Sequence, residues 1–150
     1  MTLETVLVAV GGSSPGDRLA QVAEDIAGPA GATVVLGHVF AEDDYEDTVE
    51  RLEFDDDTEV SPDAVAGRNR TVRDLEKRFD AAGIESDHRG AVGERAPEVV
   101  SMAEALDADL LVVGGRRRSP TGKAVFGSTA QEILLDAPCP VTFVKRGEYP

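Results

Sequence analysis

The chain has 150 residues, of which 41% are hydrophobic, and a formal net charge of −14 at pH 7. This length predicts one domain over residues 1–150 with a core of its own. No apolar run approaches the roughly 20 residues of a membrane span, and the segment Met1–Glu4 lacks the basic start of a signal peptide. The lone Cys139 excludes an internal disulfide, so we expect a cytoplasmic protein without a membrane partner.

The first third of the chain predicts a strand, a helix and a second strand. Residues Thr5–Val10 are rich in β-branched side chains, and a Gly-rich turn follows them. The spacing of the next apolar residues predicts a helix with one apolar face, formed by Leu19, Val22, Ala23 and Ile26. We expect this helix to end at Gly28-Pro29. The second predicted strand is Ala32–Val39.

The next segment, residues 42–63, contains twelve acidic residues and one basic residue, Arg51. Like charges repel and resist packing, so we predict a solvated acidic loop here. Its acidity argues against a nucleic-acid partner at this face. The segment lacks the spacing of a calcium loop, so we expect no metal site. An excess of Asp and Glu over Lys is also typical of a halophilic protein that works in high salt.

The middle of the chain predicts a helix and a weak strand. Ser61 and Pro62 have the residue types of an N-cap and a first helical turn, and Gly83 is a candidate C-terminal cap. The stripe that we expect to be buried consists of Val65, Val72, Leu75, Phe79 and Ala82. Residues Ile84–Gly90 predict a polar third strand.

The last third predicts a helix, a strand, a short helix and a final strand. The first helix is Ala96–Leu106, with Val99, Val100, Ala103 and Leu106 facing inward. Strands are predicted at Asp109–Val113 and Val141–Val144, with a helix at Phe126–Leu135 between them. Five strands alternating with four helices predict an α/β fold with an open parallel sheet and helices on both faces. In such sheets the ligand crevice lies at the carboxyl ends of the strands, near a switch in strand order.

A basic loop follows the fourth predicted strand. Arg116, Arg117, Arg118 and Lys123 provide four cations within eight residues, just before Gly127-Ser128-Thr129 opens a helix. Free N–H groups at a helix start favour an anion, so we prefer an anion site to a loop that is merely solubilised by its charges. The loop is not a Walker A motif, and no G-x-G-x-x-G follows the first strand.

Several motifs in this order resemble the universal stress protein family over nearly the whole chain. They are Val6–Ser13, Gly37-His38-Val39, Ala108–Gly114, Phe126-Gly127-Ser128 and Asp136–Val141. The resemblance implies a flavodoxin-like or Rossmann-like fold with strand order 3-2-1-4-5. It also implies a homodimer joined through the last strand, Val141–Val144.

The ATP-binding members of that family carry the signature G-2x-G-9x-G-[ST]. Gly114 and Gly127-Ser128 match its first, third and last positions, whereas Arg117 replaces the second glycine. The family often has Asp after the first strand, where this chain has Gly11. Arg117 would either occlude the phosphates or, with its basic neighbours, clamp them.

The resemblance implies a site for ATP or another adenine nucleotide at the loop after the fourth strand, with Mg²⁺ as a companion of ATP. The N–H groups of Gly127, Ser128 and Thr129 would hold phosphates, and Val10, Gly11 and Val39 would line the base. An ordinary N-cap is an equal alternative for Ser128. The full predicted site is Ala9, Val10, Gly11, Val39, Val113, Gly114, Arg116, Arg117, Gly127, Ser128 and Thr129.

No catalytic set is evident in the sequence. His38 and His88 lack partners at metal-ligand spacing, Ser13 lies in no G-x-S-x-G elbow, and Cys139 sits between two prolines. We therefore expect a nucleotide-binding stress regulator that is not an enzyme. The alternative is a homodimeric interaction module without a nucleotide, in which Arg117 fills the pocket. A nucleotide hydrolase ranks last because no water-activating base is apparent.

Overall fold

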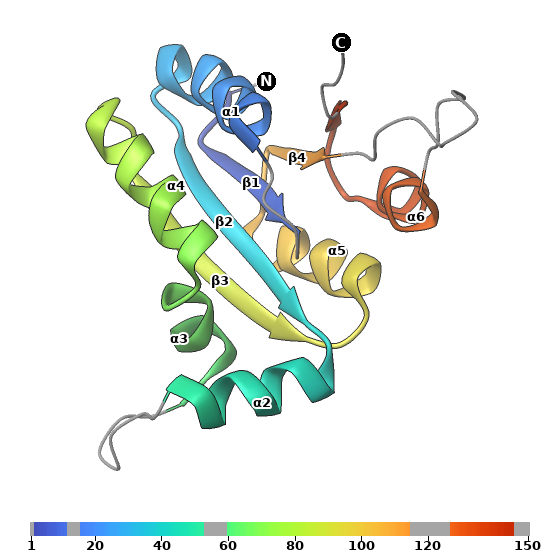
Figure 1. Ribbon diagram of the computed structural model, residues 1–150. Coiled ribbons are helices and arrows are strands. Elements are labelled where there is room, and N and C mark those ends of the chain that lie inside the picture. Colours follow the sequence, from blue (N-terminus) through green and yellow to red (C-terminus); the bar gives the residue numbers. More distant parts are fainter. Residues whose placement is uncertain (1, 12–15, 53–59, 115–126, 146–150) are drawn as a thin grey trace, which may run out of the picture.

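The computed structural model describes residues 2–11, 16–52, 60–114 and 127–145. Its strands form one sheet in which every neighbouring pair is parallel, in the order β3-β2-β1-β4-β5 (Figure 1). The strands are β1 (Thr5–Val10), β2 (Thr33–Phe40), β3 (Ser86–Val92), β4 (Leu110–Gly114) and β5 (Val141–Val144). The predicted fold class and the strand order 3-2-1-4-5 are confirmed.

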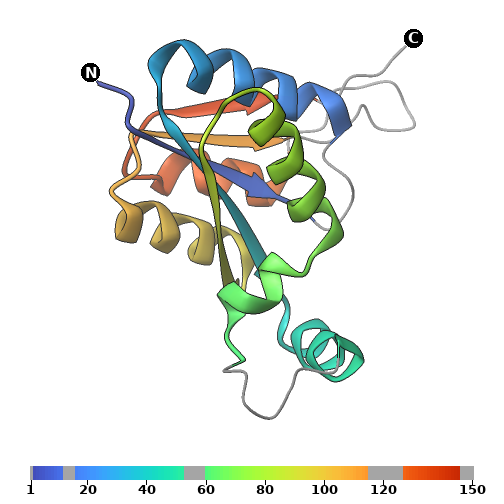
Figure 2. The same ribbon diagram turned by 90° about the vertical axis from the view of Figure 1, so that its left-hand side faces the viewer.

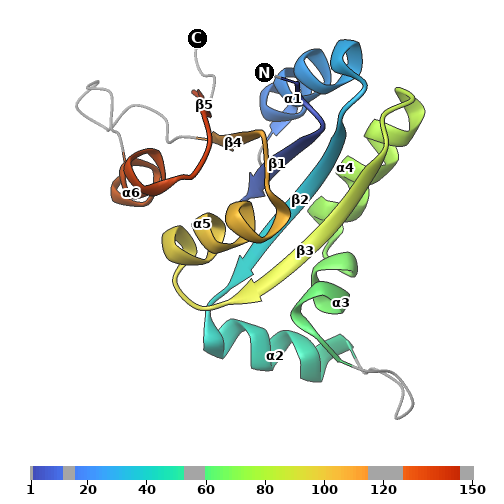
Figure 3. The ribbon, with the colours of Figure 1, turned by 180° about the vertical axis from the view of Figure 1, so that it is seen from behind.

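Helices cover both faces of the sheet, as Figure 2 shows in a view along its layers. One face packs against α1 (Gly16–Ala30) and α4 (Arg70–Ala81), and the other against α5 (Arg95–Leu106) and α6 (Ser128–Asp136). Figure 3 shows α5 and α6 next to each other on their side. Arg78 of α4 links this helix to α1 by donating to both carboxylate oxygens of Glu24, at 3.1 and 3.0 Å.

The core is divided between the two faces because successive side chains of a strand point to opposite sides. In β1, Val6, Val8 and Val10 belong to the cluster under α1 and α4. Leu7 and Ala9 belong to the cluster under α5 and α6. β1 is therefore buried on both faces, which explains why its sequence is continuously apolar instead of alternating.

Asp109 joins the amino ends of the two central strands. Its carboxylate accepts the backbone N–H groups of Glu4, at 2.9 Å, and Thr5, at 3.1 Å, and its own N–H donates to the Thr5 carbonyl. These hydrogen bonds hold the pKa of the Asp109 carboxyl below its ordinary value. The residue thus aligns β4 with β1 at the start of both strands.

The predicted acidic loop at 42–63 is wrong over its first half, where residues Glu42–Leu52 form α2. Tyr45, Val49 and Leu52 are spaced along one helical face and pack against Phe40 and Val65. The acidic first turn of α2 also lies where the helix dipole favours negative charge. The burial of this narrow apolar stripe therefore stabilises a helix in spite of the high charge of the segment. In the fold, α2 lies beyond the carboxyl ends of β2 and β3 (Figure 3).

The helix predicted from Ser61 onward divides into α3 (Pro62–Gly67) and α4. Ser61 is the N-cap of α3 as predicted, and its hydroxyl accepts the N–H of Ala64 at 3.1 Å. Asn69 starts the second helix by accepting the N–H of Val72 at 3.1 Å. An asparagine that caps the N–H groups ahead of it ends the continuity of the helix at that point.

Other element boundaries shift by a few residues from the prediction. The first helix passes Gly28-Pro29 and ends at Ala30, because the left-handed turn is made by Gly31, with φ of 69°. Gly83, with φ of 76°, makes the predicted turn after α4. Ala82 is exposed instead of buried, and Val100 and Leu106 are half-buried, whereas Met102 is buried although it was not predicted.

No helix among the described residues is long and apolar enough to cross a membrane.

Candidate functional site

The order of the strands reverses between β1 and β4. From β1 the chain moves outward to β2 and β3, and it then returns to β4 on the other side of β1. Ala9 pairs with Val113, so the glycines that end the two strands, Gly11 and Gly114, follow at the same edge of the sheet. This is the switch point at which open α/β sheets bind ligands.

The structure places the predicted site residues in two different environments. The side chains of Ala9, Val10 and Val113 are each 2% exposed and belong to the core, so that only their backbone faces the edge of the sheet. Gly11, Val39 and Gly127 are half-buried, and Gly114, Ser128 and Thr129 are exposed. Arg116 and Arg117, with Arg118 and Lys123, lie outside the described residues.

The start of α6 is a candidate anion site because its first N–H groups have no described cap. Gly127 is the N-cap, with φ −63° and ψ 152°, and its carbonyl accepts the first helical bond from Gln131 at 3.0 Å. No side chain caps this helix within the part of the chain that the structure describes. The first N–H groups of a helix have no partner inside the helix, so they point toward a ligand or solvent. Since Gly127 is the cap, the N-cap alternative for Ser128 is wrong.

Arg95 reaches the same edge from the first turn of α5. A Cβ atom placed on Gly11 would lie 2.9 Å from Nη1 and 3.3 Å from Nη2 of the guanidinium. The missing side chain at Gly11 is therefore what allows the guanidinium to lie over the end of β1. Sequence reasoning missed this residue, because 84 positions separate Arg95 from Gly11 and no local motif connects them.

His38 lies near the end of β2 and is 8% exposed. Burial lowers the pKa of His38 against the opposing effect of the Val10 carbonyl, and the positive charge of Arg95 lowers the pKa further. The ring is therefore neutral at pH 7, and its Nδ1 lies 3.3 Å from the Val10 carbonyl oxygen. Its edge-on contact with Phe40, with centroids 4.4 Å apart, fixes the ring in the sheet. The expectation of a structural strand-end histidine agrees with this arrangement.

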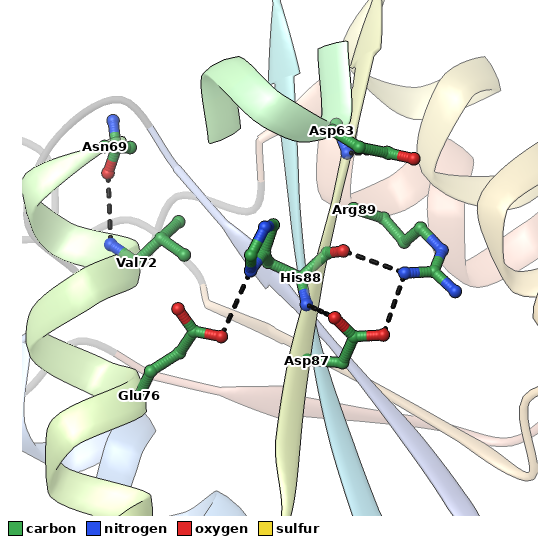
Figure 4. Close-up of polar contacts among 8 residues, drawn as sticks. Asp63, Asn69, Val72, Glu76, Asp87, His88 and Arg89 are labelled. Atoms are coloured by element: carbon green, nitrogen blue, oxygen red, sulfur yellow. Dashed lines mark hydrogen bonds and ion pairs between the residues drawn. The ribbon is translucent and has the colours of Figure 1, made fainter. Parts of the chain in front are cut away.

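A second polar cluster lies on β3 and is separate from the switch point (Figure 4). His88 Nδ1 lies 3.1 Å from a carboxylate oxygen of Glu76 in α4, and Arg89 donates to Asp87 at 2.9 Å. The backbone N–H of Gly90 donates to Asp63 at 2.7 Å. Within the described residues, no group of three or more His, Cys, Asp or Glu side chains could hold a metal ion.

The strand order, the two helical layers and the glycines at the switch point define a flavodoxin-like α/β domain with a candidate ligand site at its carboxyl edge. The sequence model of the universal stress protein family matches residues 2–145. The chain therefore belongs to the universal stress protein family.

Two relatives show how far this similarity extends. A universal stress protein of Mycolicibacterium smegmatis is 39% identical over 84 residues, which are 55% of this chain and 65% of that protein. The match thus spans about two thirds of that relative's length. A Thermus aquaticus protein, the universal stress protein in the QAH/OAS sulfhydrylase 3′ region, is 29% identical over 150 residues, covering 95% of this chain and 98% of its own.

Solved structures share the fold at lower identity. Hypothetical protein MJ0577 superposes with a TM-score of 0.73 at 18% identity, covering 99% of this chain and 100% of its own. A universal stress protein from Archaeoglobus fulgidus in complex with dAMP has a TM-score of 0.66 at 21% identity, with 97% and 100% covered. An Arabidopsis thaliana family protein with AMP bound has a TM-score of 0.65 at 18% identity, with 96% and 92% covered.

Proposed function

We propose that this chain binds ATP or another adenine nucleotide at the carboxyl edge of β1 and β4, and that it acts as a regulator through this binding. The observation that carries the proposal is the switch point. Gly11 and Gly114 end neighbouring strands there, and α6 begins with N–H groups that no described side chain caps. Family members solved with dAMP and AMP bound support the choice of an adenine nucleotide.

In this proposal the phosphates bind the start of α6. The N–H groups of Ser128 and Thr129, the hydroxyl of Ser128 and the dipole of the helix would stabilise their negative charge. Half-buried Gly11 and Val39 would line the base, and exposed Gly114 would allow the ligand close to the backbone. Mg²⁺ would arrive with ATP and be held through the phosphates and water.

A binding role without catalysis is supported by the side chains nearest to the edge. His38 is buried with Nδ1 against the Val10 carbonyl, which leaves that nitrogen unsuited to proton transfer. Arg95 keeps its proton at any physiological pH and cannot serve as a base. We accordingly propose a cytoplasmic, stress-linked regulator. We also propose that the exposed carboxylates of α2 are an adaptation to high salt.

Gly127→Asp tests the site by separating binding from stability. The new carboxylate would cap the first N–H groups of α6 and repel phosphate, so we expect ATP affinity to fall at least about tenfold. The free energy of unfolding should rise by a few tenths of a kcal/mol, because Asp is a better N-cap than Gly. Calorimetric titration and urea unfolding, both in high-salt buffer, measure the two effects.

Gly28→Asp is the matched control, because it adds the same charge in an exposed part of α1. ATP affinity should be unchanged in this variant. Wild-type protein without saturable ATP binding, or a Gly127→Asp variant that binds as tightly as wild type, would contradict the proposed site. Gly127→Val should also weaken ATP binding, through a clash with the phosphates.

Arg117→Gly decides between the two roles predicted for Arg117 from the sequence. If Arg117 clamps phosphate, the substitution weakens ATP binding by removing a charge-assisted contact. If Arg117 occludes the pocket, binding is absent in the wild type and appears in the variant. The second outcome would favour the alternative function, a homodimeric interaction module.

The alternative is supported by the outer strand β5. Its residues Val141, Thr142 and Phe143 are half-buried at the edge of the sheet, and Leu135 of neighbouring α6 is 76% exposed. A second copy pairing with Val141–Val144 would cover apolar surface and extend the sheet. Dimer formation is compatible with nucleotide binding, so the alternative differs only in lacking the ligand.

A further inference from the structure

The helix α2 is attached to the domain through a small apolar contact. The half-buried side chains of Tyr45, Val49 and Leu52 pack against Phe40 and Val65, in a cluster that is separate from the two clusters on the faces of the sheet. None of the 11 residues of α2, all of which the structure describes, is itself buried. Figure 2 shows α2 (teal) projecting from the layered part of the domain. The contact that holds α2 in place is therefore peripheral to the core.

The exposed surface of α2 carries like charges next to one another. Six of its residues are acidic, and one, Arg51, is basic. Side chains three or four positions apart are neighbours on a helix. Six pairs of acidic neighbours result, and they are Glu42–Glu46, Asp43–Glu46, Asp43–Asp47, Asp44–Asp47, Glu46–Glu50 and Asp47–Glu50. Arg51 offsets part of this repulsion, since Asp47 lies four positions before it, but the helix dipole adds to the repulsion at Glu50 in the last turn.

The two opposing forces on α2 respond differently to salt. The Debye length is about 10 Å at 0.1 M salt and about 3 Å at 1 M, whereas neighbouring side chains on a helix are about 5–6 Å apart. The repulsion between exposed carboxylates is thus largely removed within this range of concentration. The apolar contact with Phe40 and Val65 involves no charge, so screening leaves it unchanged. Salt therefore shifts the balance toward the docked helix.

We propose that α2 is a switch sensitive to ionic strength. It docks on Phe40 and Val65 when salt screens its carboxylates, and it detaches at low ionic strength while the sheet stays folded. Detachment uncovers apolar surface at Phe40, which is 6% exposed with α2 in place. The inference goes beyond the proposed function, because it requires no nucleotide and assigns the response to salt to one element of the fold.

Amide hydrogen exchange of the full chain without nucleotide measures docking element by element. We expect the protection of residues 42–52 to rise about tenfold between about 0.1 M and about 2 M KCl. Such a change corresponds to about 1.4 kcal/mol, which the screening of six like-charge pairs can supply. The amides of β1, which is buried on both faces, should stay protected at both concentrations and show that the sheet is folded.

The double variant Glu46→Gln with Glu50→Gln removes a charge from four of the six pairs. Gln and Glu have similar helix propensities, so the change acts mainly through charge. The protection of α2 should then be high already at the lower salt concentration, and its response to salt should fall to about twofold, since two pairs remain. Glu4→Gln with Glu104→Gln is the matched control, because it removes two charges from exposed positions outside α2 and should respond to salt like the wild type.

Tyr45→Ala tests the apolar half of the balance. It removes the ring that lies 5.6 Å, between centroids, from that of Phe40, although Ala itself favours a helix. We expect the protection of α2 at the higher salt concentration to fall at least about tenfold below the wild-type value, with β1 still protected. Lost protection despite the better helix former would show that docking, and not helix propensity, holds α2.

A salt response of α2 that the Glu46→Gln, Glu50→Gln variant loses and the matched control keeps would support the switch. Equal protection of α2 at the two salt concentrations in the wild type would overturn it, as would an equal response of the double variant and its control. Loss of protection in β1 together with α2 at low salt would also overturn it, because salt would then stabilise the whole domain. None of these outcomes depends on whether the chain binds a nucleotide.

Discussion

At one edge of the sheet, β3 presents outward backbone N–H groups to carboxylates, whereas at the other edge β5 presents half-buried apolar side chains. The N–H of Gly90 donates to Asp63 at 2.7 Å, and the N–H of His88 donates to Asp87 at 2.8 Å. Both N–H groups face away from β2, which is the only described strand that pairs with β3. β5 instead exposes parts of Val141 and Phe143.

The two edges of the sheet therefore differ in how readily they can pair with a strand of another molecule. An unpaired strand edge is a template for another strand unless its donors are occupied or covered. At β3 two carboxylates accept the N–H groups of His88 and Gly90, and α3 lies so close to the strand that a side chain at Gly90 would overlap the backbone of Pro62. We therefore expect strand pairing between copies at β5 and not at β3. The following substitutions test this contrast, beginning with the largest expected effect.

Gly90→Ala should destabilise the protein by about 3 kcal/mol, because its Cβ would overlap the backbone of Pro62 and displace α3 from the edge. Gly28→Ala is the matched control in α1, where the nearest atom to the new Cβ is Ile84 Cδ1 at 3.9 Å. That control should stabilise the helix by about 0.5 kcal/mol. Urea unfolding measures both, and equal effects of the two substitutions would contradict the close packing at Gly90.

Val141→Asp should convert a dimer formed through β5 into a monomer, because the pairing would bring together two carboxylates beside an apolar cluster. Partial burial of the charge should also lower the free energy of unfolding by about 2 kcal/mol. Light scattering gives the mass in solution, and Val141→Thr is the control of similar shape. A mass that is unchanged in the Asp variant, with the fold retained, would exclude β5 as the interface.

Asp63→Ala should cost about 1 kcal/mol of stability, because it leaves the Gly90 N–H at the sheet edge without its acceptor. It should also make β3 competent to pair, so that sedimentation detects new association at high protein concentration. Asp63→Asn keeps an acceptor oxygen and should behave nearly like wild type. Association that appears equally in both variants would show that the hydrogen bond does not protect this edge.

Acid should weaken the β3 edge before the apolar β5 edge. Burial raises the pKa of Asp87, but hydrogen bonds from the His88 N–H and from Arg89 outweigh burial and hold the pKa below the ordinary value of 3.8. A carboxyl whose pKa is lower in the folded state stabilises the fold above pH 3.8, and that contribution is lost as the pH falls through the folded pKa.

Asp87→Asn should therefore lower stability at pH 7 by only a few tenths of a kcal/mol, since the Asp87–Arg89 pair is largely exposed. It should also reduce the loss of stability as the pH falls below 3.8, because the folded wild type takes up this proton at a lower pH than the unfolded chain does. Urea unfolding across that range measures the effect. A pH dependence identical to that of the wild type would show that Asp87 does not contribute to it.

The sequence predicted the strands well because hydrophobic runs and glycines mark buried parallel strands directly. It missed α2 because the segment has six exposed carboxylates and only a narrow apolar stripe, Tyr45, Val49 and Leu52. This stripe is buried only when the surface formed by Phe40 and Val65 is in place. In the candidate site, the sequence indicated Gly114, Gly127 and Ser128 through the spacing of the signature. It could not indicate Arg95, whose relation to Gly11 depends on two elements that are distant in the chain.

From the sequence alone one could predict the alternation of strands and helices, the parallel sheet with helices on both faces and the glycine-marked turns at one edge of the sheet. These features depend on periodicity and on backbone conformation, which neighbouring residues control. Only the tertiary structure decided that Arg95 lies over Gly11, that Asp63 covers the Gly90 N–H and that Asp109 joins β1 to β4. Each of these contacts joins residues far apart in sequence, so it exists only after the sheet and its crossovers have assembled.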